Sequence, residues 1–296
     1  MSVEHGPSKT ALGAATLRAL AAIETRAEIG GGDYLAEIFL PEERKTTLKD
    51  AAIRESVIRN RIAPGMYEFM IARTAFFDSI VKRSLNEDIP QIIFLGAGYD
   101  SRPYRFRNMI KNTRIFELDI STTQQHKVEL LRQAGISVPE QVTFVPINFS
   151  TDNIDVVLKR ADYDSSKETL FVWEGVTYYL SAQVIDDTLN IVRSNSPAGS
   201  LICFDYHAYS PERSKDEGLK RLRDMMRTHY PGEPTLFGIR RGETEPFLSS
   251  RGYHIIEHLN STEMEMKYLI LRDGSLAGKV PVSLCLVLAS VADATA

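Results

Sequence analysis

Small and acidic residues follow two apolar runs of this sequence, and together they are suited to binding a nucleoside. Gly96-Ala97-Gly98 comes directly after the run QIIFL. Glycine at a strand end permits positive φ and lets a ligand approach the backbone without meeting a Cβ. The next run, RIFELD, ends in Glu117 and Asp119, about 20 residues after the turn, where an acid accepts hydrogen bonds from ribose hydroxyls. Asp119 is the better-placed candidate for this role, with Glu117 as the alternative.

The turn itself is a poor match to a dinucleotide site. Ser101 replaces the third glycine of a Gly-x-Gly-x-x-Gly motif, and Arg102 and Pro103 follow it. Asp100 places a negative charge beside the turn, where a pyrophosphate would be repelled. The residues therefore favour another adenosine ligand, although NAD stays open at this point.

Two later strand ends extend the pattern. Asn148 and Phe149 follow the run VTFVPI and offer an amide edge and a ring face to a purine, although an ordinary turn would use the same residues. Glu174 ends the apolar run TLFVWE. Because a buried carboxylate is costly without a partner, we expect either an arginine or a ligand cation against it. Tyr178 and Tyr179 could present ring faces to such a cation; an ion pair beside core tyrosines is the alternative.

Short apolar runs alternate with helix-compatible segments from residue 91 onwards. The predicted strands are 91–95, 114–119, 142–147, 169–174, 200–206, 253–259 and 282–290. Helices are predicted at 121–134, 151–160 and 181–194. This alternation indicates an α/β fold, with a parallel sheet covered by helices on both faces. Ligands of such sheets bind at the carboxyl ends of the strands, which is where the residues above are expected to lie.

The segment before the first strand is predicted to be helical. TALGAATLRALAAIETRA and GMYEFMIARTAFFDSIVKRSL each place apolar residues on one helical face. PEERKTTLKD, between them, predicts a loop and a short helix. After residue 206 the alternation stops until about residue 250. We therefore predict one domain, 1–296, made of a helical N-terminal cap (1–90), a cofactor-binding core (91–206), a substrate-side insertion after the fifth strand (207–250) and final strands (251–296).

Composition weighs against several classes of protein. The 296 residues are 43% hydrophobic and 25% charged, as in a globular protein with a full core. A net charge of −4 offers no basic surface to nucleic acid. No apolar run reaches the ~20 residues of a membrane helix, and the first residues lack the order of a signal peptide. The two cysteines lie in predicted core strands, which suits a reducing cytoplasm.

Four segments in combination resemble one family. FLGAGYDSRPYR, FELD, WEGVTYYL and CFDY occur in this order in the leucine carboxyl methyltransferase family, and the resemblance extends from about Ser8 to Tyr253. The family depends on S-adenosylmethionine and includes many bacterial small-molecule O-methyltransferases. The resemblance implies a class I methyltransferase fold, which is Rossmann-like, with seven strands and an antiparallel last strand.

The resemblance also implies which residues bind S-adenosylmethionine. Arg73 matches the family arginine that holds the methionine carboxylate, and Lys9 matches a lysine with the same role. The family usually has Asp at the position of Asn148, so the contact with adenine is expected to be uncharged here. The implied cofactor-binding residues are Lys9, Arg73, Gly96, Ala97, Gly98, Asp119, Asn148, Phe149 and Glu174.

The methyl acceptor is less defined. A carboxylate acceptor needs no general base, whereas a hydroxyl does, and His207 is the best-placed candidate. Tyr178 and Tyr206 are candidates for lining the acceptor pocket, and Arg102 or Arg240 for clamping an acidic substrate. The insertion is expected to form the roof of the pocket. A small-molecule acceptor is favoured, while the C-terminal carboxyl of a protein remains an alternative by kinship.

Two local motifs are expected to be coincidental. YDSSK (163–167) matches the Tyr-x-x-x-Lys of short-chain dehydrogenases, but that motif requires a helix and this segment predicts a loop. His254 and His258 lie on a predicted strand without a third ligand, so no metal site is expected. An NAD-dependent oxidoreductase and a cofactor-binding protein without turnover remain alternative functions, and the oligomeric state is open.

Overall fold

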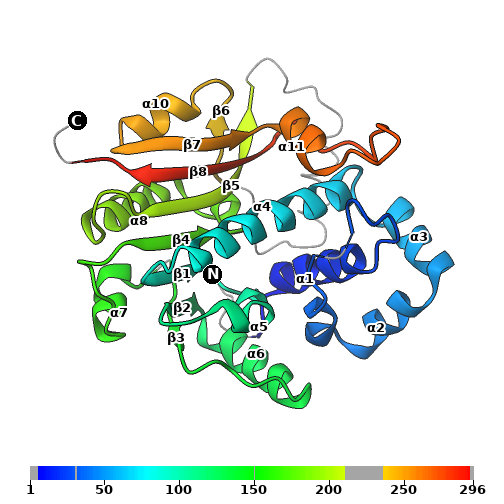
Figure 1. Cartoon of the computed structure of the whole chain (residues 1–296), viewed down its shortest axis with the longest axis horizontal. Helices are drawn as coiled ribbons and strands as arrows, with labels where there is room; N and C mark the ends of the chain where they lie inside the picture. Colours follow the sequence, from blue (N-terminus) through cyan, green and yellow to red (C-terminus); the bar gives the residue numbers. More distant parts are fainter. Residues whose placement is uncertain (1–5, 31, 150, 211–235, 294–296) are drawn as a thin grey trace.

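The computed structural model describes residues 6–30, 32–149, 151–210 and 236–293, and its centre is a twisted sheet (Figure 1). The strand order is β3-β2-β1-β4-β5-β8-β7, with the short β6 paired to β5. The strands are β1 (Gln91–Leu95), β2 (Arg114–Asp119), β3 (Val142–Pro146), β4 (Thr169–Trp173), β5 (Leu201–Tyr209), β6 (Ile239–Arg240), β7 (Tyr253–Leu259) and β8 (Leu284–Val291). Strands β1 to β5 are parallel, and β8 is antiparallel to both β5 and β7. The predicted α/β fold with an antiparallel last strand is confirmed.

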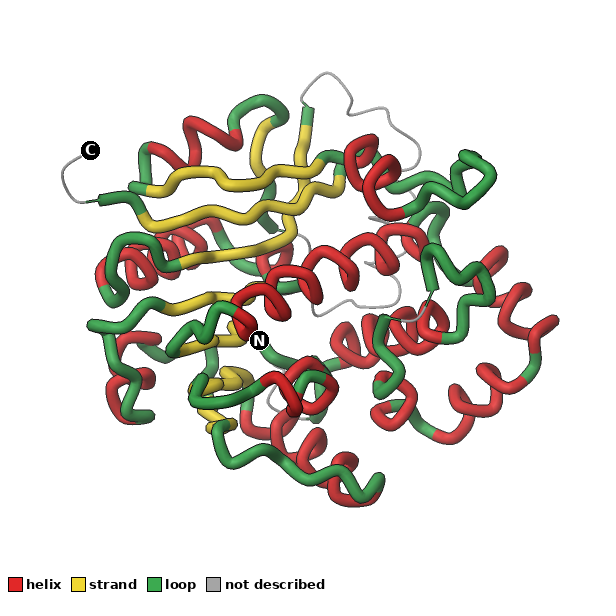
Figure 2. The backbone as a smooth tube through the Cα atoms, viewed as in Figure 1, coloured by secondary structure: helices red, strands yellow, loops and turns green. Residues whose placement is uncertain are grey.

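Helices cover both faces of the sheet (Figure 2). They are α1 (Lys9–Ala22), α2 (Glu42–Lys49), α3 (Ala51–Asn60), α4 (Met66–Asn86), α5 (Arg102–Arg105), α6 (Ser121–Gln133), α7 (Ile154–Arg160), α8 (Ala182–Ser194), α10 (Thr244–Ser249) and α11 (Ser261–Tyr268). The 3-10 helices are η2 (Ala36–Phe39), η3 (Arg107–Met109) and η4 (Thr177–Tyr179). Within the described ranges, no helix combines the length and apolar character needed to cross a bilayer.

Alternation along the strands divides the hydrophobic core into two layers. In β1, Ile92 and Phe94 pack with the core formed by α1, α4 and α11, whereas Ile93 and Leu95 pack with that formed by α7, α8 and α10. Each buried strand therefore carries apolar residues on both faces, which explains why the strands appear in the sequence as unbroken apolar runs.

The N-terminal helices lie to one side of the sheet, and α4 crosses one of its faces (Figure 1). The predicted helices within residues 10–27 and 65–85 are confirmed as α1 and α4. The segment PEERKTTLKD (41–50), predicted as a loop and a short helix, contains α2, and the helix that follows it, α3, is not predicted by the sequence. Asp50 ends α2 and caps α3: its carboxylate accepts hydrogen bonds from the backbone of Ala52 (2.8 Å) and Ile53 (3.1 Å).

The segment after β5 is only partly described. β5 continues to Tyr209, beyond the predicted end at residue 206, because β8 pairs along it from Leu201 to His207 and β6 pairs with its last two residues. The short β6 and α10, which the sequence does not predict, follow before β7. Most of the predicted insertion, residues 211–235, lies outside the described residues, so its expected role as the roof of the pocket stays a prediction.

Glu117 forms a fully buried ion pair beneath the end of β2. Its Oε2 lies 2.6 Å from Lys127 Nζ on α6, and its Oε1 accepts a hydrogen bond from Tyr104 Oη at 2.9 Å. Lys127 Nζ also lies 5.3 Å from the centre of the Tyr104 ring. Both oxygens of Glu117 are thus engaged inside the protein. Its alternative role as a ribose ligand is contradicted by this arrangement.

Removal of one member of this pair should be strongly destabilising. Glu117→Leu leaves the buried Lys127 ammonium without its carboxylate, and we expect the free energy of unfolding to fall by about 3–5 kcal/mol. The double variant Glu117→Leu/Lys127→Met removes both charges and should lose much less. Urea titrations of wild type and both variants measure this difference. A double variant as unstable as Glu117→Leu would contradict the interpretation.

Candidate functional site

The Gly-x-Gly turn after β1 is held closely between two neighbouring segments. Gly96 has φ 75° and Gly98 has φ 46°. The backbone N–H groups of Gly96 and Ala97 both donate to the Leu118 carbonyl on β2, each at 2.9 Å. A Cβ on Gly96 would lie 2.5 Å from Val176 Cγ2, in the loop after β4. The turn therefore needs glycine, both for its φ and for the close approach of that loop.

Asp119 joins the end of β2 to the turn. Its Oδ2 accepts a hydrogen bond from Gly98 N at 2.6 Å, and its Oδ1 accepts one from Ile120 N at 2.7 Å. The Asp119 carbonyl in turn accepts a hydrogen bond from Ile147 N at the end of β3. The Asp119 carboxylate is thus held by two backbone donors at the carboxyl edge of the sheet. Asn148 directly follows Ile147, the residue that bonds the Asp119 carbonyl.

The first turn of α1 lies over the same region. Ala11 Cβ lies 3.2 Å from the position that a Cβ on Gly98 would take. The Ser8 backbone N–H donates to Thr123 Oγ1 at the start of α6 (3.2 Å), and the Ser8 side chain caps α1. Lys9, the first residue of α1, is exposed. The segment that carries Lys9 therefore lies against the glycine turn and the first turn of α6, close to the end of β2.

Glu174 lies directly after β4 between two buried arginines. Its Oε1 is 3.0 Å from Arg73 Nε on α4, and its Oε2 accepts a hydrogen bond from Arg102 Nη1 at 2.7 Å. Arg73 Nη1 also donates to Asp205 Oδ2 on β5 at 2.8 Å. Only 5% of Arg73 and 3% of Arg102 is exposed. The sequence predicts an arginine or a ligand cation beside Glu174, and the structure shows arginines on both of its oxygens.

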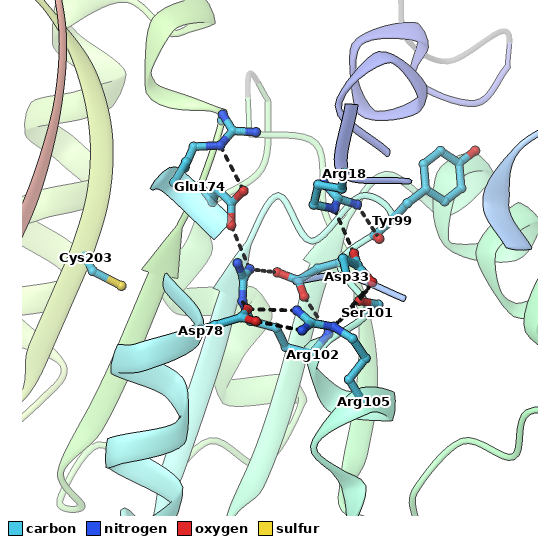
Figure 3. Close-up of polar contacts among 12 residues, drawn as sticks. Arg18, Asp33, Asp78, Tyr99, Ser101, Arg102, Arg105, Glu174 and Cys203 are labelled. Carbon is cyan, nitrogen blue, oxygen red and sulfur yellow. Dashed lines mark hydrogen bonds and ion pairs between the residues drawn. The ribbon is translucent and has the colours of Figure 1, made fainter. Parts of the chain in front are cut away.

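These contacts belong to a larger buried ion network, part of which is drawn in Figure 3. Arg102 also pairs with Asp78 and Asp100, at 2.7 and 2.6 Å. Asp78 pairs in turn with Arg105, whose Nε lies 3.3 Å from Asp33. The members of the network are Arg18, Asp33, Asp78, Asp100, Arg102, Arg105, Glu174, Arg73 and Asp205. It links α1, α4, α5, the residue directly after β4 and the interior of β5.

For most of these groups, ion pairing has a larger effect on the pKa than burial has. Burial works to raise the pKa of Asp78, but Arg102 and Arg105 hold it below its ordinary value. Burial likewise opposes the charge on Arg73, whereas Glu174 and Asp205 raise its pKa above the ordinary value. Asp205 differs, because burial raises the pKa of this carboxyl against the opposing effect of Arg73.

The expected acceptor residues are divided between the two faces of the sheet. Tyr178 on η4 is buried, and its ring lies edge-on to His207 with 4.8 Å between ring centroids. His207 shares a face of β5 with Asp205, two residues earlier. Tyr206 points to the opposite face, where its hydroxyl bonds Thr244 Oγ1 (2.6 Å) and His258 Nε2 (2.8 Å). Tyr178 and His207 therefore come together, and Tyr206 lies apart from them.

Two arginines were expected to clamp an acidic substrate. Arg102 is instead committed to Asp78, Asp100 and Glu174 within the protein, which contradicts that role. Arg240 is exposed on β6 and pairs through its backbone with Tyr209. Arg102 thus acts on the candidate site through Glu174.

The remaining adenine candidates follow β3. Asn148 N donates to Asp152 Oδ2 at 2.8 Å, and the Asn148 carbonyl accepts hydrogen bonds from the backbone of Thr151 and Asp152. Phe149 is half-buried and packs against the core on the α7 and α8 face. A tight turn therefore holds this pair beside the end of β2.

Asp205 is the principal residue that the sequence interpretation missed. It lies in the quoted segment CFDY, completely buried in β5, and its Oδ1 accepts a hydrogen bond from Gly175 N at 2.6 Å. A single carboxylate inside an apolar strand is the signal that singles out Glu174, and the same signal applies to Asp205. Nothing in the sequence, however, pairs Asp205 with Arg73.

The two motifs expected to be coincidental have structural explanations. Tyr163 lies in the loop after α7, where its hydroxyl bonds Thr169 Oγ1 and the Asn195 carbonyl, and Lys167 lies 3.6 Å from Asp164. His254 is exposed on β7, and His258 bonds Tyr206. No cluster of histidine, cysteine or acidic residues suited to a metal ion is present among the described residues.

Comparison with known proteins points to one family. A family model described as leucine carboxyl methyltransferase matches residues 11–193. YktD of Bacillus subtilis (strain 168), named a candidate S-adenosyl-L-methionine-dependent methyltransferase, is 28% identical over 209 residues, 70% of this chain and 68% of that protein. A Mycobacterium marinum protein named in the same way is 33% identical over 137 residues, 46% of this chain but only 43% of its own length.

Solved structures show the same fold. A candidate methyltransferase from Thermobifida fusca YX has a TM-score of 0.60 at 14% identity, covering 97% of this chain and 96% of its own. A DUF574 family protein from Streptomyces avermitilis has a TM-score of 0.57 at 12% identity, covering 93% of this chain and 96% of its own. At these identities the likeness concerns the arrangement of helices and strands.

The close contact between Gly96 and Val176 makes a measurable prediction. Gly96→Ala introduces both a positive-φ strain and a clash, so we expect the free energy of unfolding to fall by about 2–4 kcal/mol. Gly135→Ala is the matched control, because Gly135 has φ 68° but no atom within 4 Å of the added Cβ. The control should lose only about 1 kcal/mol. Equal losses in thermal and urea unfolding would show that the contact with Val176 is unimportant.

Proposed function

Since this chain belongs to the leucine carboxyl methyltransferase family, we propose that it transfers the methyl group of S-adenosylmethionine to an oxygen of a small molecule. The family model matches more than half of the chain, and the relatives are named for S-adenosylmethionine-dependent methyl transfer. The chain is accordingly an S-adenosylmethionine-dependent methyltransferase. The oxygen acceptor, its carboxylate or hydroxyl nature and the small-molecule substrate form the proposal.

The cofactor assignment rests on the residues that lie together at the carboxyl ends of β1, β2 and β4. The glycine turn has no room for a Cβ at Gly96, where it lies against Val176. Val176 is two residues beyond Glu174 in the chain. At Gly98 the backbone of the turn donates a hydrogen bond to Asp119. S-adenosylmethionine carries a charged amino acid at one end and adenine at the other, with the ribose diol between them. We propose that Asp119 binds the ribose and that Glu174 faces the ammonium group. The backbone of Gly96, Ala97 and Gly98 would then pass under the methionine portion.

The other assignments follow the same logic of complementary groups. We propose that Arg73 and Lys9 hold the methionine carboxylate, and that Asn148 and Phe149 bracket the adenine. Arg73 lies behind Glu174 and Asp205 and is almost fully buried. Its proposed contribution to holding the carboxylate is therefore its positive charge, and its pairing with Glu174 also fixes that residue. Lys9, exposed on the segment over the turn, remains accessible to a ligand carboxylate.

When bound, S-adenosylmethionine would supply a methyl group carried on a positively charged sulfur. The acceptor oxygen would form the new bond to this carbon as the S–C bond breaks, with its electron pair staying on sulfur. The protein contributes mainly by holding the acceptor in line with that bond. The Tyr178 hydroxyl is buried, and burial raises the pKa of Tyr178 well above its ordinary value. Tyr178 is therefore a neutral hydroxyl at neutral pH, and His207 beside it is the candidate base for a hydroxyl acceptor.

The structure gives no support to the alternative of an NAD-dependent oxidoreductase. The helix after the turn, α5, has only four residues, so it offers little helix dipole to a pyrophosphate. The N–H of Arg102 at its start donates to Asp100, whose carboxylate would repel a phosphate. The position of the third motif glycine is Ser101, whose hydroxyl bonds Asp33.

Calorimetric titration separates the two cofactors. We expect S-adenosylmethionine and S-adenosylhomocysteine to bind with micromolar dissociation constants and NAD to show no heat of binding. Asp119→Ala should weaken both sulfur ligands by about tenfold, because it removes charge-assisted hydrogen bonds to the ribose. Binding of NAD in preference to both sulfur ligands would overturn the assignment.

The acceptor class can be read from the chemical stability of the product. With S-adenosylmethionine labelled in its methyl group, a methyl ester releases volatile methanol in mild alkali, whereas a methyl ether does not. We expect label on small carboxylic acids or phenols in a metabolite panel and none on peptides ending in leucine. Efficient labelling of the peptides would favour the protein C-terminal alternative. Binding without transfer to any acceptor would favour the protein without turnover.

A further inference from the structure

Asp205 is a completely buried carboxylate that the proposed function leaves without a role. Each of its oxygens has a defined partner: Oδ1 accepts from Gly175 N at 2.6 Å and Oδ2 from Arg73 Nη1 at 2.8 Å. Its own carbonyl accepts a hydrogen bond from the Thr177 hydroxyl. One residue thus fixes the backbone directly after Glu174, the arginine that pairs with Glu174, and the start of η4.

The charge of the surrounding network is unbalanced. Its guanidinium groups belong to Arg18, Arg73, Arg102 and Arg105, and its carboxylates to Asp33, Asp78, Asp100, Glu174 and Asp205. Among the described residues, and with all nine groups ionised, four positive charges against five negative ones leave a net charge of −1. All nine side chains are at most 11% exposed. Water therefore screens this excess poorly.

The two forms of the ligand differ by one positive charge. S-adenosylmethionine carries a carboxylate, an ammonium and a sulfonium, for a net charge of +1, whereas S-adenosylhomocysteine lacks the sulfonium charge and is neutral overall. Binding of the methylated form would balance the network. Binding of the demethylated form would leave the buried negative charge uncompensated, which is costly in a site shielded from water.

We propose that Asp205 is a positioning residue that fixes Arg73 and Gly175 around Glu174, and that the negative charge it adds makes the site select the methylated cofactor over the demethylated product. The inference rests on the proposed cofactor site. Its consequence is ligand exchange: after transfer, the product no longer matches the charge of the site and leaves more readily. Asp205 acts through Arg73 and Glu174.

A purely structural role for Asp205 would have a different signature. Loss of the hydrogen bonds to Arg73 and Gly175 would disturb the site for every ligand that has the same amino acid and nucleoside. S-adenosylmethionine and S-adenosylhomocysteine share both parts, so their affinities would fall by the same factor. A role in charge selection changes the ratio of the two affinities.

The test is calorimetric titration of wild type, Asp205→Asn, Asp205→Glu and Asp119→Asn with three ligands. These are S-adenosylmethionine, S-adenosylhomocysteine, and sinefungin, whose amine carries a positive charge in place of the sulfonium. In Asp205→Asn, we expect the affinity for both cationic ligands to fall at least about tenfold relative to that for S-adenosylhomocysteine. Asp205→Glu keeps the charge and should restore most of the ratio. Asp119→Asn, at the ribose end, should weaken all three ligands by a similar factor.

An unchanged ratio in a folded Asp205→Asn variant would overturn the inference while leaving the cofactor site intact. A wild type that binds none of the three ligands would instead overturn the proposed function. If Asp205→Asn does not fold, as judged by circular dichroism, the wild type itself provides the test. Tighter binding of S-adenosylmethionine and sinefungin than of S-adenosylhomocysteine supports charge selection, and the reverse order contradicts it.

Discussion

The pairing of Glu174 with Arg73 and Arg102 is the interaction on which the site depends. Guanidinium and carboxylate groups with so little exposure are stable only when each has a partner at hydrogen-bond distance, because an unpaired buried charge costs several kcal/mol. The groups involved come from α4, from the start of α5, from the residue directly after β4 and from the interior of β5. These elements must therefore take one relative arrangement, which also places the glycine turn beside Asp119.

The network gives the N-terminal helices a part in the site. Arg18 on α1 pairs with Asp33 and donates to the Tyr99 carbonyl directly after the glycine turn, and α4 contributes Arg73 and Asp78. α1 also covers Gly98 through Ala11. The helical segment before β1 is thus more than a cover for the sheet. It supplies Arg73, whose positive charge pairs with both Glu174 and Asp205 and allows these two carboxylates to lie close together in an apolar sheet.

Most of the fold could be predicted from the sequence, because strands buried on both faces appear as short apolar runs. The bounds of β1, β2 and β7 agree with the prediction residue for residue. Errors arose where contacts with distant segments or a single cap decide the structure. β5 is longer because β8 and β6 pair with it, and the additional helix α3 begins where the Asp50 side chain caps it.

The sequence by itself determined the family and the residue types at each strand end, because a glycine turn and acids after apolar runs are local features of the chain. Only the tertiary structure decided the partners of those residues. Glu117 and Asp119 share one strand face, yet one faces Lys127 and the other the glycine turn. Arg102 faces Glu174 rather than solvent, and Asp205 meets an arginine 132 residues earlier in the chain. Such pairings depend on distances between segments far apart in sequence, and residue spacing carries no information about them.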